Sequence, residues 1–506
     1  MSRWKRVLLW GLAGILVLLL WSGLDLRPWP RATGASAGSD QGPTTSETLV
    51  RPVPATSMAD VDVVVYGTQT SGIAAVREIT RTDPELRVAI ISSGDYLESP
   101  LAQGLSVEDA RNVDEVAGGV YSEWRRAVMT HYRGLGVNPF TDSGRFVYEP
   151  KVASDCLWSL IEGSTPGQVL FYAGTLLAAS DNDEARYVDL RLASGTSIRV
   201  HTRYFIDASV EADLSRMLGA SYRVGRSEDV YNDREGPVPA FPSQANGFAT
   251  APQRFSVLLT LRIYAGGEAP RHLPAAGPQL GLADATAVQL SPKAVQAFAR
   301  CWTMNTATLP GDCRELNETW NDYPDQPAAF QWIFEPDKRA ELATLAARRS
   351  LDLVAYLQER GYAAVGVDSV PQYPYIREGP RVVGLTTYTM PHIVAGARDE
   401  VVAVGCYTLY DRHDIFKPNQ LDKTTWVQVP MQALVVAGHP SLLVSTAIST
   451  SYRAYSSPVR TELTRANLGG AAGVIVTLAA RMAIEPSQVP YTLVRALLRE
   501  RGYQIP

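Results

Sequence analysis

One segment near residue 65 constrains the fold more than any other part of the chain. It begins with a mainly β-branched run, Val61–Tyr66, passes through a turn bounded by Gly67 and Gly72, and continues into an apolar helical start at Ile73–Val76. A second apolar run, Val88–Ile91, follows after one helix length. This order of strand, glycine turn, helix and strand is typical of a βαβ unit of about 30 residues. The segment therefore predicts an α/β fold with a parallel sheet.

The turn of this unit is of a kind that binds dinucleotides. Free N–H groups at a helix N-terminus bind a pyrophosphate, and glycines let the backbone approach it. The match is partial, because Gln69 replaces the central glycine and Ser92 stands where an acidic residue usually holds the ribose. A tight strand-to-helix turn without any nucleotide is the alternative. The candidate nucleotide contacts are Gly67, Thr68, Gln69, Thr70, Ser71, Gly72 and Ser92.

Composition and charge narrow the class of partner. The chain has 506 residues and a formal net charge of −5, with no block of Lys and Arg beyond its first six residues. Nucleic-acid binding needs a basic surface, so a small molecule is the expected partner. The four cysteines and six histidines show no metal-ligand spacing, which predicts no metal site. Cys301 and Cys313 are close enough in sequence for a disulfide, and two buried thiols are the alternative.

The first residues are predicted to target the chain to a membrane. Arg3, Lys5 and Arg6 precede an apolar run, Val7–Leu24, which would span about 27 Å as a helix. By the positive-inside rule the body of the protein would lie outside the cytoplasm. We therefore predict a signal anchor over residues 1–30 and a flexible stalk over 31–59. Cleavage after the small residues Ala35–Ala37 is the alternative, and it would yield a secreted protein.

Several ordered blocks of the chain resemble one known family. They are Tyr96–Ser106, Phe146–Val152, Phe205–Leu214, Tyr222–Arg226, Pro374–Glu378, Val429–Leu434 and Leu468–Gly473. In this order they resemble the FAD-dependent oxidoreductases that include the xanthan-lyase-like flavoproteins. The resemblance implies an FAD/NAD(P)-binding Rossmann-like domain formed by residues 60–214 and 397–506. It also implies a mixed α+β substrate domain, residues 215–396, inserted between these segments.

The resemblance implies roles for single residues as well. Leu176 would lie beside the adenine of FAD, and Ala208 and Ser209 would close a turn over the dinucleotide. Arg377 would bind an anionic substrate group or the reduced flavin, and an ion pair with Glu378 or another carboxylate is the alternative. A cluster of small residues would open the last helix, with its N–H groups facing the flavin. This cluster is Gly469, Gly470, Ala471 and Ala472.

Four departures from the family pattern fall where FAD would be held, at Gln69, Ser92, Glu98 and Ser99. Glu98 and Ser99 replace glycines that approach the phosphates in the family, and a carboxylate there repels the pyrophosphate unless it turns outward. Two functions therefore stay open. The first is an exported, membrane-tethered FAD-dependent oxidoreductase acting on a small molecule. The second is a flavoprotein-like scaffold that has lost FAD and serves as a binding or assembly protein at the cell surface.

The inserted region is rich in aromatic residues and is predicted to contain a long helix over 337–360. Aromatic faces suit sugar rings, so a carbohydrate-like substrate is one hypothesis. An aromatic hydrophobic core explains the same composition. The residues in question are Trp302, Trp320, Tyr323, Phe330, Trp332 and Phe334.

Overall fold

The computed structural model describes a defined set of residues within the range 57–506. These are residues 57–108, 110, 112–141, 144–162, 165–182, 184–225, 252–264, 269–272, 313–317, 321–323, 326–359, 362–396, 399–411, 419–456 and 458–506. The predicted anchor, nearly all of the predicted stalk, and Cys301, Trp302 and Trp320 lie outside this set. The anchor therefore stays a prediction. The predicted Cys301–Cys313 disulfide is corrected, because Cys313 is a buried thiol, as the alternative proposed.

A twisted eight-stranded sheet carries the fold, in the order β1-β6-β5-β4-β3-β2-β7-β15. Strands β4, β3, β2, β7 and β15 run parallel, whereas β4, β5 and β6 form an antiparallel meander. The predicted βαβ unit is confirmed, because Val63 pairs in parallel register with Val88. The strands are β1 (Ser57–Asp60), β2 (Val63–Tyr66), β3 (Val88–Ser92), β4 (Val169–Asn182), β5 (Ala185–Leu192), β6 (Ser197–His201), β7 (Tyr204–Asp207) and β15 (Leu442–Val444).

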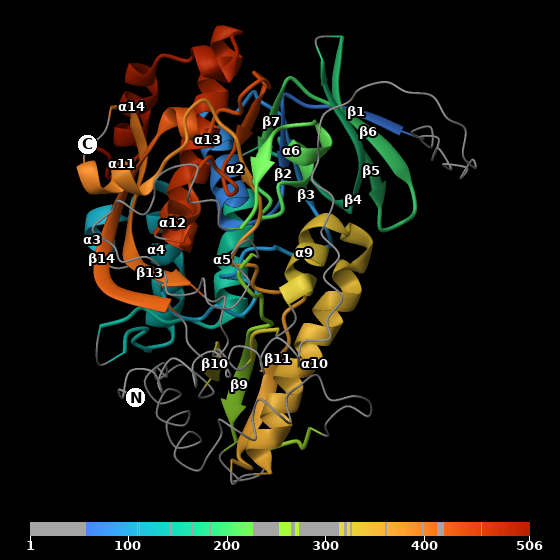
Figure 1. Cartoon of the computed structure of the whole chain (residues 1–506), viewed down its shortest axis with the longest axis vertical. Coiled ribbons are helices and arrows are strands. Elements are labelled where there is room, and N and C mark those ends of the chain that lie inside the picture. Colours follow the sequence, from blue (N-terminus) through green and yellow to red (C-terminus); the bar gives the residue numbers. More distant parts are fainter. Residues whose placement is uncertain are drawn as a thin grey trace, which may run out of the picture. The chain divides into compact units, whose positions relative to one another are not determined.

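Helices cover the parallel part of the sheet, which explains why its strands are apolar on both faces. Helix α2 (Thr70–Thr82) follows β2 and packs against α13 (Glu462–Met482). Helices α4 (Gly119–Gly134), α5 (Pro150–Ile161) and α14 (Tyr491–Glu500) complete this layer, and Figure 1 shows α2 and α13 side by side. Within the described part of the chain, α13 alone is long and apolar enough to cross a membrane, and 94% of its most apolar window is buried inside the protein.

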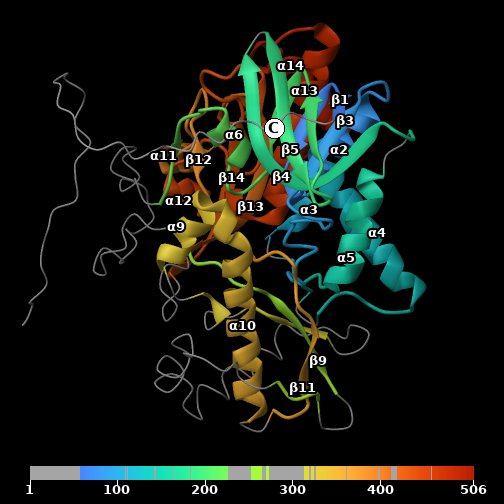
Figure 2. The same cartoon turned by 90° about the vertical axis from the view of Figure 1, so that its right-hand side faces the viewer.

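A second hydrophobic cluster lies away from this sheet. Strands β9 (Leu259–Ile263), β10 (Cys313–Leu316) and β11 (Val365–Ser369) form an antiparallel sheet in the order β10-β9-β11. Helices α9 (Gln326–Phe334) and α10 (Arg339–Gln358) pack with it, and both cartoon views place α10 beside β9 and β11 (Figures 1 and 2). The long helix expected over 337–360 is thus present. The predicted domain boundaries at 214 and 397 stay predictions.

The remaining elements include several that pack into the core of the large sheet. They are α3 (Val113–Val116), α6 (Asp213–Met217), α11 (Met390–Ala395), α12 (Tyr452–Tyr455), the pair β8 (Tyr222–Arg223) and β12 (Arg381–Val382), and the hairpin β13 (Val401–Asp411) and β14 (Asn419–Pro430). The hairpin packs against α13.

Candidate functional site

The turn between β2 and α2 is closed against the loop after β7. Gly67 has a left-handed backbone with φ of +102°, and a Cβ there would lie 2.6 Å from the backbone nitrogen of Ser209. A Cβ on Gly72 would lie 2.1 Å from the carbonyl oxygen of Gly67. Both positions therefore require glycine for a tight turn. The turn brings together two groups of predicted contacts, residues 67–72 and the pair Ala208 and Ser209.

The carboxylate of Glu98 is hydrogen-bonded to polar groups of this turn. It accepts hydrogen bonds from the backbone N–H groups of Thr68 (3.0 Å) and Ser93 (2.9 Å), and the Glu98 N–H donates to the Thr68 hydroxyl at 2.9 Å. Thr68 is fully buried and Gln69 is 2% exposed. Burial raises the pKa of Glu98, and the nearby charge of Glu211 raises it further. A carboxyl group of the protein itself thus stands where the sequence predicted a bound pyrophosphate.

A second carboxylate approaches the same turn from α13. The Thr70 hydroxyl donates to Glu462 at 2.5 Å and lies 2.6 Å from the Ser99 hydroxyl. Arg465 donates to the other oxygen of Glu462 at 2.9 Å. The Ser71 hydroxyl lies 2.5 Å from that of Thr446. The hydroxyls at the start of α2 therefore have partners within the protein.

Ser92, predicted to hold a ribose, is also engaged internally. Its hydroxyl donates to the carbonyl oxygen of Tyr96 at 2.7 Å and accepts a bond from the Thr68 hydroxyl at 3.1 Å. Its side chain is 1% exposed. A ligand would have to displace these bonds to reach the Ser92 oxygen.

The predicted helix start at Gly469–Ala472 is wrong. Helix α13 begins at Glu462, so these four residues lie in its interior, where their N–H groups belong to the helix ladder. The small side chains have a packing role. A Cβ on Gly469 would lie 1.9 Å from the carbonyl oxygen of Ser71, so the backbones of α13 and α2 touch there.

Two alanine substitutions test this packing role. We expect Gly469→Ala to lower the free energy of unfolding by about 1–3 kcal/mol, because its Cβ meets backbone that cannot move aside. Gly134→Ala is the matched control, since Gly134 is also a helical glycine and no heavy atom lies within 4 Å of a Cβ built there. It gains helix propensity, up to about 1 kcal/mol, without a clash. Urea unfolding measures both variants, and equal stabilities would contradict the role assigned to Gly469.

Arg377 lies in the second hydrophobic cluster and does not line the pocket described below. Its guanidinium forms an ion pair with Asp322 at 3.1 Å, with both side chains almost completely buried. It also donates to the carbonyl oxygen of Arg254 and to the Ser256 hydroxyl, each at 3.0 Å. The ion pair that the alternative expected is therefore present, with Asp322 as the partner, while Glu378 pairs with Arg381.

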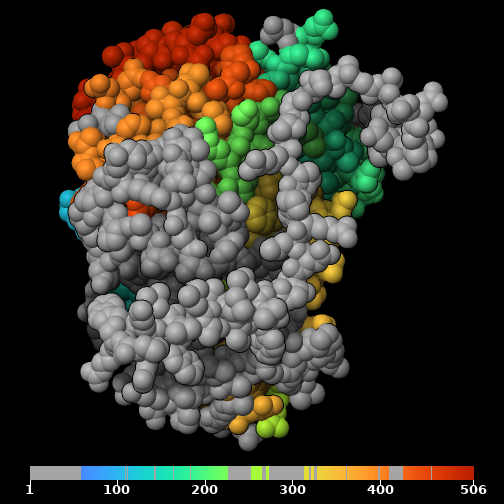
Figure 3. All heavy atoms as spheres, viewed as in Figure 1, coloured from blue at the N-terminus to red at the C-terminus, as the bar shows by residue number. Residues whose placement is uncertain are grey.

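A pocket of about 710 Å³ opens beside the turn, at the carboxyl ends of β2, β3 and β7 and beside the middle of β4. It is lined from the sheet by Tyr66, Ser93, Leu176 and Ser209, and from the other side by α9, α10 and Tyr373. In the space-filling view, yellow atoms of this second region are seen between green atoms near α6 and teal atoms of the meander (Figure 3). The pocket is lined by two predicted FAD contacts, Leu176 and Ser209, and by Glu98, one of the departures from the family pattern. Two members of the aromatic set, Trp332 and Phe334, line it as well.

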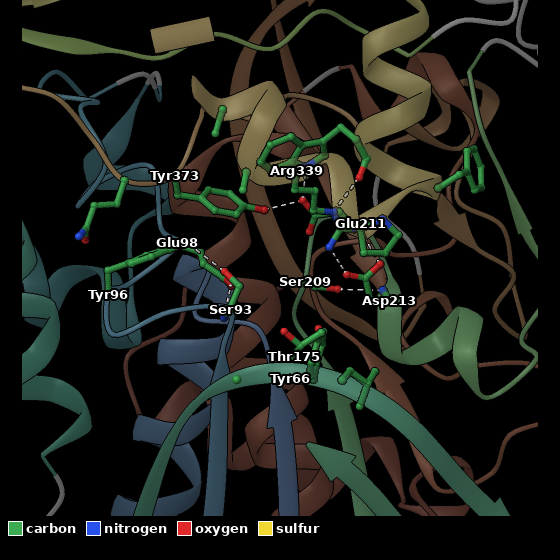
Figure 4. Close-up of a pocket in the computed structure, with 18 of the residues that line it drawn as sticks. Tyr66, Ser93, Tyr96, Glu98, Thr175, Ser209, Glu211, Asp213, Arg339 and Tyr373 are labelled. Carbon is green, nitrogen blue, oxygen red and sulfur yellow. Dashed lines mark hydrogen bonds and ion pairs between the residues drawn. The ribbon is translucent and has the colours of Figure 1, made fainter. Parts of the chain in front are cut away.

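Charged and aromatic side chains converge in the pocket, as Figure 4 shows. Asp213 forms ion pairs with Arg339 (2.5 Å) and Arg216 (2.6 Å), and these cations lower its pKa against the opposing effect of burial. Glu211 accepts hydrogen bonds from the Tyr373 hydroxyl (2.5 Å) and the Trp332 indole (2.6 Å). Apart from Trp332, sequence reasoning missed this set. The Glu-Ala-Asp run after β7 was the available signal.

Asp207 fixes the loop that carries these acidic residues. One oxygen accepts bonds from the N–H and hydroxyl of Ser209, and the other accepts bonds from the N–H and hydroxyl of Ser215, all within 3.0 Å. Burial nevertheless raises the pKa of Asp207 from 3.8 to about 6. The folded protein therefore binds this proton more tightly than the unfolded chain does.

This difference predicts a pH-dependent stability. The stabilisation from protonated Asp207 is complete below about pH 4 and is lost as pH rises through about 6, a change of roughly 3 kcal/mol. Asp207→Asn removes this titration. We therefore expect the unfolding free energy of the wild type, relative to the variant, to fall between pH 4 and 6.5. Urea unfolding across that range is the measurement, and a constant difference would contradict the assignment.

These contacts decide how well FAD fits in the pose that the family resemblance implies. A pyrophosphate at the start of α2 would meet the carboxylates of Glu98 and Glu462 at the Thr68 N–H and the Thr70 hydroxyl. Two like charges 4 Å apart repel by about 4 kcal/mol at an effective dielectric constant of about 20. That exceeds the roughly 1.5–3 kcal/mol from one hydrogen bond to a charged group such as a phosphate. The residues present do not fit FAD in that pose.

No group of three or more His, Cys, Asp and Glu side chains suited to a metal ion occurs in the part of the chain that the structure describes.

Comparisons with known proteins place the chain in a family. The model of the family described as FAD dependent oxidoreductase matches residues 62–498. Among solved structures, a mutant of quinol fumarate reductase FrdA from E. coli is similar, with 14% identity, a TM-score of 0.34, and coverage of 88% of this chain and 74% of that one. A geranylgeranyl bacteriochlorophyll reductase-like protein from Thermoplasma acidophilum has 10% identity and a TM-score of 0.34, with coverage of 88% and 85%. No curated protein matches the chain in sequence. Because the family model matches most of its length, the chain belongs to the FAD-dependent oxidoreductase family.

Proposed function

We propose that this family member holds a small organic molecule, and not FAD, at the carboxyl edge of its sheet. One observation carries the proposal. The Glu98 carboxylate accepts the backbone N–H groups of Thr68 and Ser93, at the place where the family resemblance puts a phosphate. The pocket beside this closed turn has about 710 Å³, within the range of small-molecule sites. The protein would then be a binding or assembly protein built on a flavoprotein frame.

We further propose that the protein works outside the cytoplasm, tethered to the membrane. The support is the order of Arg3, Lys5 and Arg6 before the apolar run Val7–Leu24. Cleavage near Ala35–Ala37 would instead release it. Protease added to intact cells tests the topology: we expect it to degrade the body of the chain, and full protection would overturn this part of the proposal.

The cofactor question is tested by the visible absorption spectrum of the purified full-length chain, before and after incubation with FAD. We expect a colourless, folded protein that takes up no flavin after removal of free FAD. A spectrum with one bleachable flavin per chain would overturn the proposal. Circular dichroism and a cooperative thermal transition establish that the tested protein is folded.

A second candidate function is an FAD-dependent oxidoreductase, and one feature of the pocket favours it. Leu176 and Ser209, both placed near FAD by the family resemblance, line the pocket, so its space overlaps the expected adenine side. FAD would then bind after Glu98 swings away from Thr68. The same spectrum distinguishes the two functions, and a flavin that bleaches on reduction would favour this one. The small substrate, carbohydrate-like or otherwise, would then have to be found by screening.

A further inference from the structure

Two carboxylates at the pocket wall have no cation of their own. Glu98 and Glu211 both line the pocket and are 7% and 3% exposed. They lie close enough that the charge of Glu211 contributes to the raised pKa of Glu98. Among the described residues, no Lys or Arg is hydrogen-bonded or ion-paired to either carboxylate, although Arg216 donates to the carbonyl oxygen of Glu211 at 3.1 Å and the Glu211 charge acts on Arg339. The partners of Glu98 are backbone N–H groups, and those of Glu211 are a phenol and an indole.

Both arginines that line the pocket are ion-paired with a third carboxylate. Arg216 and Arg339 both pair with Asp213. Three carboxylates against two guanidinium groups leave the pocket wall with one net negative charge. One oxygen of Glu211 accepts both the Tyr373 and the Trp332 bonds, and its second oxygen accepts no hydrogen bond from the residues that the structure describes. This oxygen is not among the fully buried polar atoms, so a cationic ligand in the pocket can reach it and donate a charge-assisted hydrogen bond.

Aromatic rings stand next to these carboxylates. The centroids of Tyr96 and Tyr373 are 6.4 Å apart, and those of Trp332 and Tyr373 are 5.7 Å apart. The bonds from Tyr373 and Trp332 to Glu211 hold both rings in place, as Figure 4 shows for Tyr373. Burial and the nearby carboxylates raise the pKa of Tyr373 well above its ordinary value, so its ring stays neutral. Neutral aromatic faces attract an organic cation.

We infer that the pocket binds an organic ammonium ion, with its charged nitrogen between Glu98 and Glu211 and its apolar body against Tyr96, Tyr373 and Trp332. This inference rests on the proposed function, because it places the ligand in the pocket in place of FAD. A sugar would use the same rings, but it would gain little from the net negative charge. An anion such as a nucleotide is disfavoured by that charge.

Three probes that differ only in their end group test the inference. Tyramine, tyrosol and 4-hydroxyphenylacetate share a phenol ring and a short chain that ends in an ammonium, a hydroxyl and a carboxylate. Titration calorimetry on the full-length chain would measure their affinities. We expect millimolar binding of tyramine, at least tenfold weaker binding of tyrosol and none of the carboxylate. Equal binding of tyramine and tyrosol, or tighter binding of the carboxylate, would overturn the inference.

A variant of Glu211 localises the effect. Glu211→Gln keeps an oxygen for the Tyr373 and Trp332 bonds and removes the charge, so tyramine affinity should fall about tenfold while tyrosol affinity stays the same. Glu315→Gln is the matched control, because Glu315 is also a buried glutamate but lies in β10, outside the pocket. It should leave tyramine binding unchanged. Unchanged tyramine binding in Glu211→Gln would place the cation elsewhere and overturn the inference.

A parallel FAD titration separates this inference from the proposed function. Absence of both FAD and tyramine binding would overturn the ammonium inference and leave the proposed function standing. Stoichiometric FAD binding that excludes tyramine would overturn both.

Discussion

The double variant Glu98→Gly/Ser99→Gly is expected to bind FAD on the order of a hundredfold more tightly than the wild type. It removes the carboxylate that occupies the Thr68 and Ser93 N–H groups and restores the glycines that the family pattern places there. The variant relieves a charge repulsion of about 4 kcal/mol, which is the upper limit of the gain in binding free energy. The gain is smaller than this limit because Glu98 in the wild type can turn aside at some cost. Quenching of flavin fluorescence during titration of the full-length chain measures the change.

Two control variants separate the effect of the Glu98 charge from the effect of side-chain volume. Glu98→Gln keeps the volume of the side chain and removes its charge, so we expect a smaller gain in FAD affinity than in the double variant. Ser99→Gly alone leaves Glu98 in place and should gain nothing. A folded double variant that still binds no FAD would mean that Glu98 is not the group that closes the turn. The contact between α2 and α13 would then be the next cause to test.

Arg377→Met is expected to lower the free energy of unfolding by about 3 kcal/mol and to leave ligand binding in the pocket unchanged. The variant removes the ion pair of Arg377 with buried Asp322, and breaking a buried ion pair usually costs about 3–5 kcal/mol. We expect a cost at the low end of this range, because Arg349 is also buried near Asp322 and supplies part of the compensating charge. Urea unfolding measures the loss.

Arg262→Met is the matched control for this prediction. Arg262 of β9 pairs with Asp368 of β11, but its side chain is 40% exposed. The loss of unfolding free energy should therefore stay below about 1 kcal/mol. If Arg377→Met kept its stability and lost ligand binding, Arg377 would be a binding residue after all.

The sequence predicted the sheet well because the signals for it are local. The run Val63–Tyr66 is apolar throughout, since the parallel strand it forms is covered on both faces. Gly67 and Gly72 mark the turn because the contacts of that turn exclude any Cβ. Such short-range constraints are readable from neighbouring residues alone.

The pocket could not be predicted in the same way, because its lining comes from distant segments. Glu211 follows β7, Arg339 begins α10 and Tyr373 lies after β11, and no spacing along the chain links them. The start of α13 could not be predicted for a different reason. Small residues such as Gly469 are typical of a helix start near a cofactor, but they also allow two helix backbones to touch. Only the partner helix distinguishes these two explanations.

The contact between α2 and α13 also sets when the protein can finish folding. Thr70 and Glu462 are hydrogen-bonded across 392 positions of the chain. At a synthesis rate of about 5–20 residues per second, roughly 20–80 s separate their emergence from the ribosome. During that interval the part of α2 that contacts α13 has no partner helix. The nascent chain must therefore keep an apolar surface from aggregating until its last helices are made, which makes the first βαβ unit one of the last parts to become stable.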